Sequence, residues 1–237
     1  MDVDILYKPS YSLGVLKLAG GEEVRVEGGA MVSMSDGVTL ETKATGGLLN
    51  SLARSILGGE SFFQNTFKAP SGGGEVSVAP ALPGDLFSIK LNNESMMVQS
   101  GSYVASETGV ELDTKWGGAK TFFASEGLIM LRSSGNGELL LSSYGAIHER
   151  NLADGEKFTV DTGHLVAFTE KIGFKVNKVG GLKSTIFSGE GLVVELTGPG
   201  RVLMQTRSTD AFLAWLIPQL PKPSSSSSSG TTFKIGG

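Results

Sequence analysis

The sequence contains no cysteine among its 237 residues and has only two histidines, His148 and His164. The missing cysteine excludes disulfide bonds, a catalytic thiolate and cysteine-ligated zinc, and it fits a reducing compartment. A metal site built from histidines needs two or three imidazoles that converge with a carboxylate. Because the two histidines lie in different parts of the chain, we expect no metal site and no other cofactor.

Other familiar signals are also missing. The chain has no G-x-S-x-G elbow, P-loop, dinucleotide G-x-G-x-x-G or H-E-x-x-H. No run of about 18 apolar residues occurs, so no transmembrane helix is predicted. The formal net charge of −4 makes nucleic acid an unfavoured partner. The amino terminus lacks the basic n-region of a signal peptide and the composition of a transit peptide, so we expect the protein in the cytoplasm.

What the sequence has in quantity is glycine, with 34 residues, and much of it belongs to a repeated pattern. The pattern V-x-x-G-x-x-V, called a block below, occurs three times, each time followed by a Gly pair, a glutamate beside a glycine, and a Gly-x-Gly sequence. The last glycines of the Gly-x-Gly sequences are 63 residues apart. Four landmarks in the same order predict a triplicated β-unit. The blocks span Val26–Val32, Val98–Val104 and Val160–Val166, and the Gly-x-Gly sequences are Gly72/Gly74, Gly135/Gly137 and Gly198/Gly200.

The predicted fold is all-β, with triplicated double-stranded β-helix or β-sandwich units in a pseudo-threefold arrangement. The units span residues 1–91, 92–154 and 155–217, and a flexible Pro/Ser-rich tail covers 218–237. We interpret the Gly-x-Gly sequences as hairpin turns between paired strands. Their lack of a third glycine and of a following helix argues against a phosphate-binding loop.

Two helices are predicted within this β-pattern. The first is inserted at about 48–57, where it caps the open end of the β-structure or, alternatively, docks on a partner or a membrane surface. The second runs over about 209–217, from capping residue types to Pro218, and is apolar on nearly all sides. We expect it to pack on the barrel or on another subunit. The candidate partner surface consists of Leu52, Ile56, Phe212 and Trp215.

Glutamates recur at equivalent places in the three units: Glu60, Glu126 and Glu190. Around a threefold axis, equivalent carboxylates converge, where they would bind a cation or share protons. The favoured alternative is that each caps a turn or faces solvent.

The stretch from Gly101 to Arg207 resembles a known family. The sequences that carry the resemblance are Val98–Ala105, Trp116–Gly118, Ser188–Leu192 and Gly198–Arg207. They are similar to those of the prokaryotic relatives of the "altered inheritance of mitochondria" biogenesis protein. The resemblance implies a fold like that of the tryptophan RNA-binding attenuator protein, as three fused units. It also implies a link to the mitochondrial relative, which is tied to inner-membrane organisation and the assembly of scaffold complexes. No motif here matches the attenuator protein's ligand contacts, so tryptophan and RNA binding do not follow.

Together these observations favour a non-enzymatic scaffold or binding protein that acts through self-association or a protein partner. An alternative is a small-ligand or RNA binder that uses clefts between the repeats. A cupin-type metalloenzyme is least favoured, because the ligands are missing. Peripheral contact with a membrane is compatible with the sequence.

Overall fold

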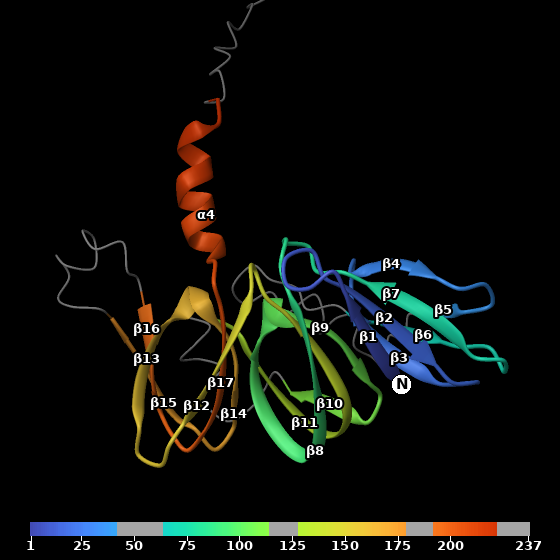
Figure 1. Ribbon diagram of the computed structural model, residues 1–237, viewed down its shortest axis with the longest axis horizontal. Coiled ribbons are helices and arrows are strands. Elements are labelled where there is room, and N and C mark those ends of the chain that lie inside the picture. The colour runs from blue at the N-terminus through green and yellow to red at the C-terminus, as the bar shows by residue number, and fades with distance from the viewer. Residues whose placement is uncertain (42–63, 114–127, 179–191, 222–237) are drawn as a thin grey trace, which may run out of the picture.

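A computed structural model describes residues 1–41, 64–113, 128–178 and 192–221, and these residues confirm the all-β prediction (Figure 1). The alternation of buried and exposed residues along strands such as β2 is typical of strands with one face in a core. The strands are β1 (Asp2–Leu6), β2 (Leu13–Leu18), β3 (Glu23–Glu27), β4 (Met31–Met34), β5 (Thr39–Glu41), β6 (Gln64–Lys68), β7 (Gly74–Val78), β8 (Leu86–Gln99), β9 (Tyr103–Glu107), β10 (Val110–Asp113), β11 (Met130–Ser142), β12 (Ile147–Leu152), β13 (Lys157–Asp161), β14 (Leu165–Thr169), β15 (Gly173–Lys178), β16 (Leu192–Thr197) and β17 (Gly200–Gln205). The helical elements are η1 (Ser100–Ser102), η2 (Thr162–His164), α4 (Thr209–Leu216) and η3 (Ile217–Gln219).

These strands form antiparallel sheets that are arranged along the long axis of the molecule (Figure 1). One sheet has the order β1-β2-β7-β4, and another, at the opposite end, has the order β13-β16-β15. A third sheet, of order β12-β17-β14-β8-β11-β9-β3-β6-β5 with β10 added beside β11, extends from one end of the molecule to the other (Figure 1). The long strands β8 and β11, of 14 and 13 residues, lie in the middle of this sheet.

The Gly-x-Gly sequences are not hairpin turns, and that prediction is wrong. Gly135 and Gly137 lie inside the continuous strand β11, where a β-bulge occurs between Gly135 and Asn136. The strands on either side of the other two sequences, β6 and β7 or β16 and β17, pair with different neighbours and not with each other. The positive φ angles of Gly135 (107°) and Gly137 (142°) let the chain turn a corner while it continues as a strand.

The three blocks each connect two strands. The second passes from β8 through η1 to β9, the third passes from β13 through η2 to β14, and the first lies between β3 and β4. The predicted boundary at 91/92 falls inside β8, and the boundary at 154/155 falls between β12 and β13. The triplication and its pseudo-threefold axis stay predictions.

The buried apolar residues of the described chain form three clusters in a row. The first extends from Leu16 to Leu140, the second from Ile89 to Leu203, and the third from Met97 to Met204. The residue ranges of the clusters overlap, and strands β8 and β11 contribute side chains to all three.

A partly buried ion pair ties the central sheet to the turn after β14. Arg132 Nε donates to Glu170 Oε1 at 2.6 Å, and its Nη2 donates to Glu170 Oε2 at 3.0 Å and to Ser95 Oγ at 3.1 Å. The hydrogen bonds from Arg132 hold the pKa of Glu170 below its ordinary value. Bidentate pairing of this kind fixes orientation as well as charge.

This pair predicts a specific loss of stability in acid. Because the pKa of Glu170 is lowered in the folded state, its contribution is present above the ordinary glutamate pKa of about 4.3 and is lost as the pH falls through the folded value. Glu170→Gln should cost about 1 kcal/mol at neutral pH, since both side chains are partly exposed. Urea denaturation as a function of pH should show wild type and variant converging in acid.

The matched control is Glu195→Gln, which removes the charge from an exposed pair with Lys157, whose Nζ lies 3.8 Å from Glu195 Oε1. Exposed ion pairs contribute little, so this control should keep wild-type stability at neutral pH. A Glu170→Gln variant whose stability lies parallel to that of wild type at every pH would contradict the assignment.

Candidate functional site

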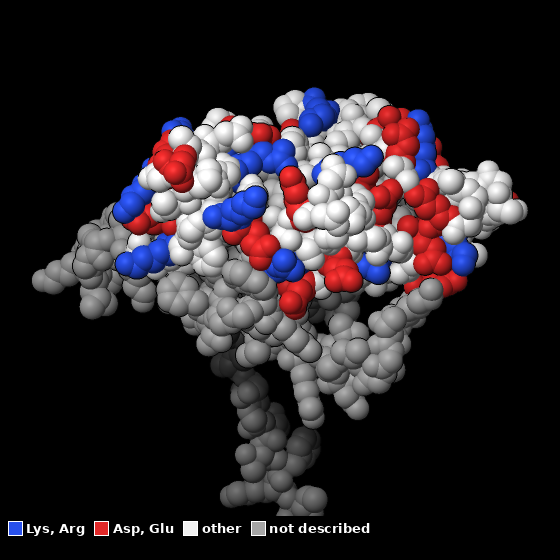
Figure 2. All heavy atoms as spheres, turned by 90° about the horizontal axis from the view of Figure 1, so that it is seen from below, with Lys and Arg blue, Asp and Glu red and all other residues white. Residues whose placement is uncertain are grey.

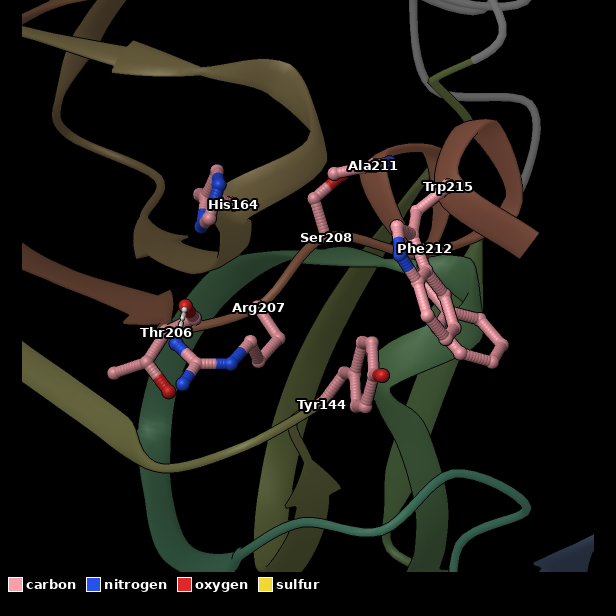
Figure 3. A pocket seen from close by; sticks show the side chains of 8 residues that line it. All are labelled: Tyr144, His164, Thr206, Arg207, Ser208, Ala211, Phe212 and Trp215. Carbon is pink, nitrogen blue, oxygen red and sulfur yellow. Dashed lines mark hydrogen bonds between the residues drawn. The ribbon is translucent and has the colours of Figure 1, made fainter. Parts of the chain in front are cut away.

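The candidate site is a cleft at the base of α4, with a volume of about 490 Å³ (Figure 3). Its walls come from the end of β11, from η2 and from the segment that leads out of β17 into α4. The lining residues are Tyr144, His164, Thr206, Arg207, Ser208, Ala211, Phe212 and Trp215.

Gln205, the last residue of β17, holds the two walls of the cleft together. Its side-chain Oε1 accepts from the Tyr144 backbone N–H at 2.8 Å, and its Nε2 donates to the Gly163 carbonyl at 2.8 Å. The Gln205 carbonyl lies 2.7 Å from His164 Nδ1, which carries a proton and donates to it. Because the Gln205 side-chain amide bonds to one wall through its oxygen and to the other through its nitrogen, it fixes the distance between the two walls.

Ser208 starts α4 at the rim of the cleft. It is the N-cap residue, and its Oγ accepts from the Ala211 backbone N–H at 3.4 Å. Gly163 approaches it closely, because a Cβ at position 163 would lie 2.6 Å from Ser208 Oγ. A glycine in η2 is therefore required for the N-terminus of α4 to sit where it does. The prediction of capping residue types before a helix that ends at Pro218 is confirmed.

Aromatic rings fasten α4 to the β-body. Phe212 packs edge-on against Tyr144, with ring centroids 6.1 Å apart, and Trp215 follows at 6.1 Å from Phe212 (Figure 3). Phe212 is half-buried by this packing, while Trp215 is 63% exposed. Phe212 therefore attaches the helix, and Trp215 is the side chain that faces outward.

The remainder of α4 is uncovered, and Figure 1 shows it projecting from the β-body. None of its residues is buried, although every residue from Ala211 to Leu216 is apolar. Leu213, Ile217 and Leu220 join Trp215 among the large apolar side chains that face solvent. No helix in the described ranges is long and apolar enough to cross a membrane.

The cleft offers surfaces for recognition. Tyr144 and Phe212 contribute aromatic rings to the cleft, and the Arg207 guanidinium lies toward Thr206, whose carbonyl accepts from its Nη1 at 3.0 Å (Figure 3). Within the described ranges, no three His, Asp or Glu side chains come close enough together to hold a metal ion. His148 lies exposed in β12, and His164 lines the cleft.

Of the residues predicted as a partner surface, the structure brings Phe212 and Trp215 together at the cleft. Leu52, Ile56, the predicted helix at 48–57 and the glutamates Glu60, Glu126 and Glu190 lie outside the described residues. Sequence reasoning missed Tyr144 and Gln205, which are 61 residues apart in the chain. No local pattern marks either of them.

Charge is mixed over the face seen in Figure 2. Lys and Arg side chains alternate there with Asp and Glu, and no continuous basic stripe crosses the visible described surface. Nucleic-acid binding relies on a concentrated basic patch. This face therefore offers no electrostatic footprint for a nucleic acid.

Comparison with known proteins identifies a family and similar proteins. Residues 3–207 match the model of the family described as mitochondrial biogenesis AIM24. An uncharacterized protein of Streptococcus pyogenes serotype M6 is 28% identical over 222 residues, which covers 90% of this chain and 89% of that protein. A crystal structure of a Streptococcus pyogenes protein from a structural genomics consortium is similar, with a TM-score of 0.76 and 27% identity, and it covers 92% of this chain and 99% of that one. The chain belongs to the mitochondrial biogenesis AIM24 family.

Proposed function

We propose that the chain is a non-enzymatic scaffold protein of the cytoplasm that works through protein–protein contacts, with α4 as its anchor. The observation that carries the proposal is the uncovered apolar surface of α4 and the following η3, where Leu213, Trp215 and Ile217 face solvent. A helix that is apolar on all sides is normally covered. Covering these side chains would contribute favourable free energy at about 25 cal/mol per Å².

The polar groups beside α4 also support a structural use of the cleft. The Nδ1 of His164, the amide of Gln205 and the hydroxyl of Ser208 are each used in hydrogen bonds that hold the helix base together. These bonds position α4 on a rigid body. The family model matches residues 3–207, and α4 follows directly after them.

The test is native mass spectrometry of the full chain purified gently from its own host. Wild type should carry the mass of a bound polypeptide from another protein, in addition to any multiple of its own chain. Trp215→Glu should lose it, because a carboxylate replaces the exposed ring. Trp215→Glu should keep wild-type stability within about 0.5 kcal/mol, since position 215 is exposed.

Tyr11→Glu is the matched control, because Tyr11 is an aromatic side chain that is 75% exposed and lies outside α4. It should retain the bound polypeptide. If wild type carries no polypeptide, or Trp215→Glu retains it fully, then α4 is not the anchor.

The second candidate is a small-ligand binder, which the aromatic cleft with Arg207 favours. An added mass too small for a polypeptide would support it, and quenching of tryptophan fluorescence by that compound should be lost in Trp215→Phe. If the compound were RNA, binding should weaken steeply with salt.

A further inference from the structure

The blocks pair with one another in a fixed register. Strands β3 and β9 pair with Val26 opposite Ala105, and strands β8 and β14 pair with Val98 opposite Ala167. In both cases the first valine of one block lies opposite the residue that follows the last valine of the next block. We call each such pairing a seam. The same contact therefore occurs twice, and it joins consecutive blocks.

A third seam would need the strand before the third block and the strand after the first. These are β13 and β4, which lie at opposite ends of the molecule (Figure 1). Among the described strands, β13 pairs only with β16, and β4 pairs only with β7. Each therefore has one edge beside which no described strand lies. Unpaired strand edges are templates for another chain.

The side chains of β4 show what the missing seam would cover. Met31, Val32 and Met34 are 40%, 57% and 45% exposed. The equivalent side chains after the second and third blocks are at most 1% exposed, and they are Tyr103, Val104 and Ser106 in β9 and Leu165, Val166 and Phe168 in β14. The fold thus buries this strand wherever a neighbouring block is present and leaves it uncovered where none is.

We infer that a second copy of this chain supplies the missing neighbour, so that β13 of one copy pairs antiparallel with β4 of the next. The register of the two internal seams places Val160 opposite Ser33 and Thr159 opposite Met34. The inference rests on the proposed function, because it names a second copy as a partner of the scaffold. The contact is head-to-tail, so repetition gives a closed ring or an open filament.

The charges at the two strand edges support a second copy of the chain as the neighbour. Two steps further along the same register, Lys157 of one copy would lie beside Asp36 of the next. Both residues are exposed. Opposite charges directly across a strand pair are stabilising, and like charges are destabilising. The edges of β13 and β4 therefore carry complementary charges, and their register is the same as that of the two internal seams.

Sedimentation velocity of the full chain over a concentration series tests the inference. Wild type should form species larger than a monomer, and Val32→Lys should raise the dissociation constant by about a hundredfold or more, because the equivalent positions are fully buried. Tyr11→Lys introduces the same charge at an exposed apolar site outside β4, and it should assemble as wild type does. Urea denaturation checks that each variant keeps its fold.

A charge exchange tests the register. Asp36→Lys alone should raise the dissociation constant by about fivefold, and adding Lys157→Glu should restore it. A wild type that is monomeric at the highest soluble concentration, or a Val32→Lys variant that assembles normally, overturns the inference. If assembly is lost in Trp215→Glu and kept in Val32→Lys, the anchor on α4 stands and the strand seam fails.

Discussion

Replacing Phe168 with alanine should lower the free energy of unfolding by about 3–5 kcal/mol. Phe168 is fully buried in β14, where it lies opposite Met97 of β8 in one seam and opposite Val202 of β17. Its ring packs against Phe174 with centroids 5.4 Å apart. Truncation would leave a cavity between two rigid sheets that cannot close around it.

Urea denaturation followed by circular dichroism measures this loss. Phe212→Ala is the control, because Phe212 is a half-buried phenylalanine that contacts Tyr144 and Trp215 at the base of α4. It should cost about 1 kcal/mol or less. A Phe168→Ala variant that loses no more than Phe212→Ala would show that the seam is loosely packed.

Gly84→Ala should have a comparable effect, of about 3 kcal/mol or more, for a different reason. A Cβ on residue 84 would lie 1.6 Å from the carbonyl oxygen of Ser143. At this crossing, the Asp85 N–H donates to the Gly145 carbonyl at 2.9 Å, and the Gly145 N–H donates to the Pro83 carbonyl at 3.0 Å. The side chain would force the two segments apart and break these bonds.

The same crossing holds a buried carboxylate. Asp85 Oδ1 accepts from Ser12 Oγ at 3.1 Å and from the Leu86 backbone N–H at 2.8 Å. Separating the segments would expose this group as well, and thermal denaturation should show a lower midpoint. Gly72→Ala is the control, since nothing lies within 4 Å of its added Cβ. Equal stability of the two alanine variants would show that the crossing tolerates a methyl group.

The sequence predicts local features well because they depend on nearby residues. The capping residue Ser208 and Pro218, for example, bound α4. The Gly-x-Gly sequences mislead because a glycine with positive φ serves a hairpin and a strand corner equally well. Which one forms depends on strand pairing between distant segments, and no local pattern contains that information.

The cleft could be predicted only in part for the same reason. Phe212 and Trp215 stand out as apolar residues on one short helix. Tyr144 lies far from them in the sequence, and its backbone is held beside the helix by a hydrogen bond to Gln205 of β17. For α4 the sequence predicts packing on the barrel or on another subunit, and the structure shows little packing on the barrel. Within the described chain, only Phe212 and Leu216 of its large side chains are partly covered.

The overlapping apolar clusters have a consequence for how the molecule comes apart. The first cluster reaches no further along the chain than Leu140, and the third begins at Met97, so the central strands β8 and β11 are the common support of both. Stability in such a row is close to a sum of nearest-neighbour terms. Amide hydrogen exchange should therefore be slowest in β8 and β11 and should accelerate toward both terminal sheets, so that opening proceeds from the ends inward.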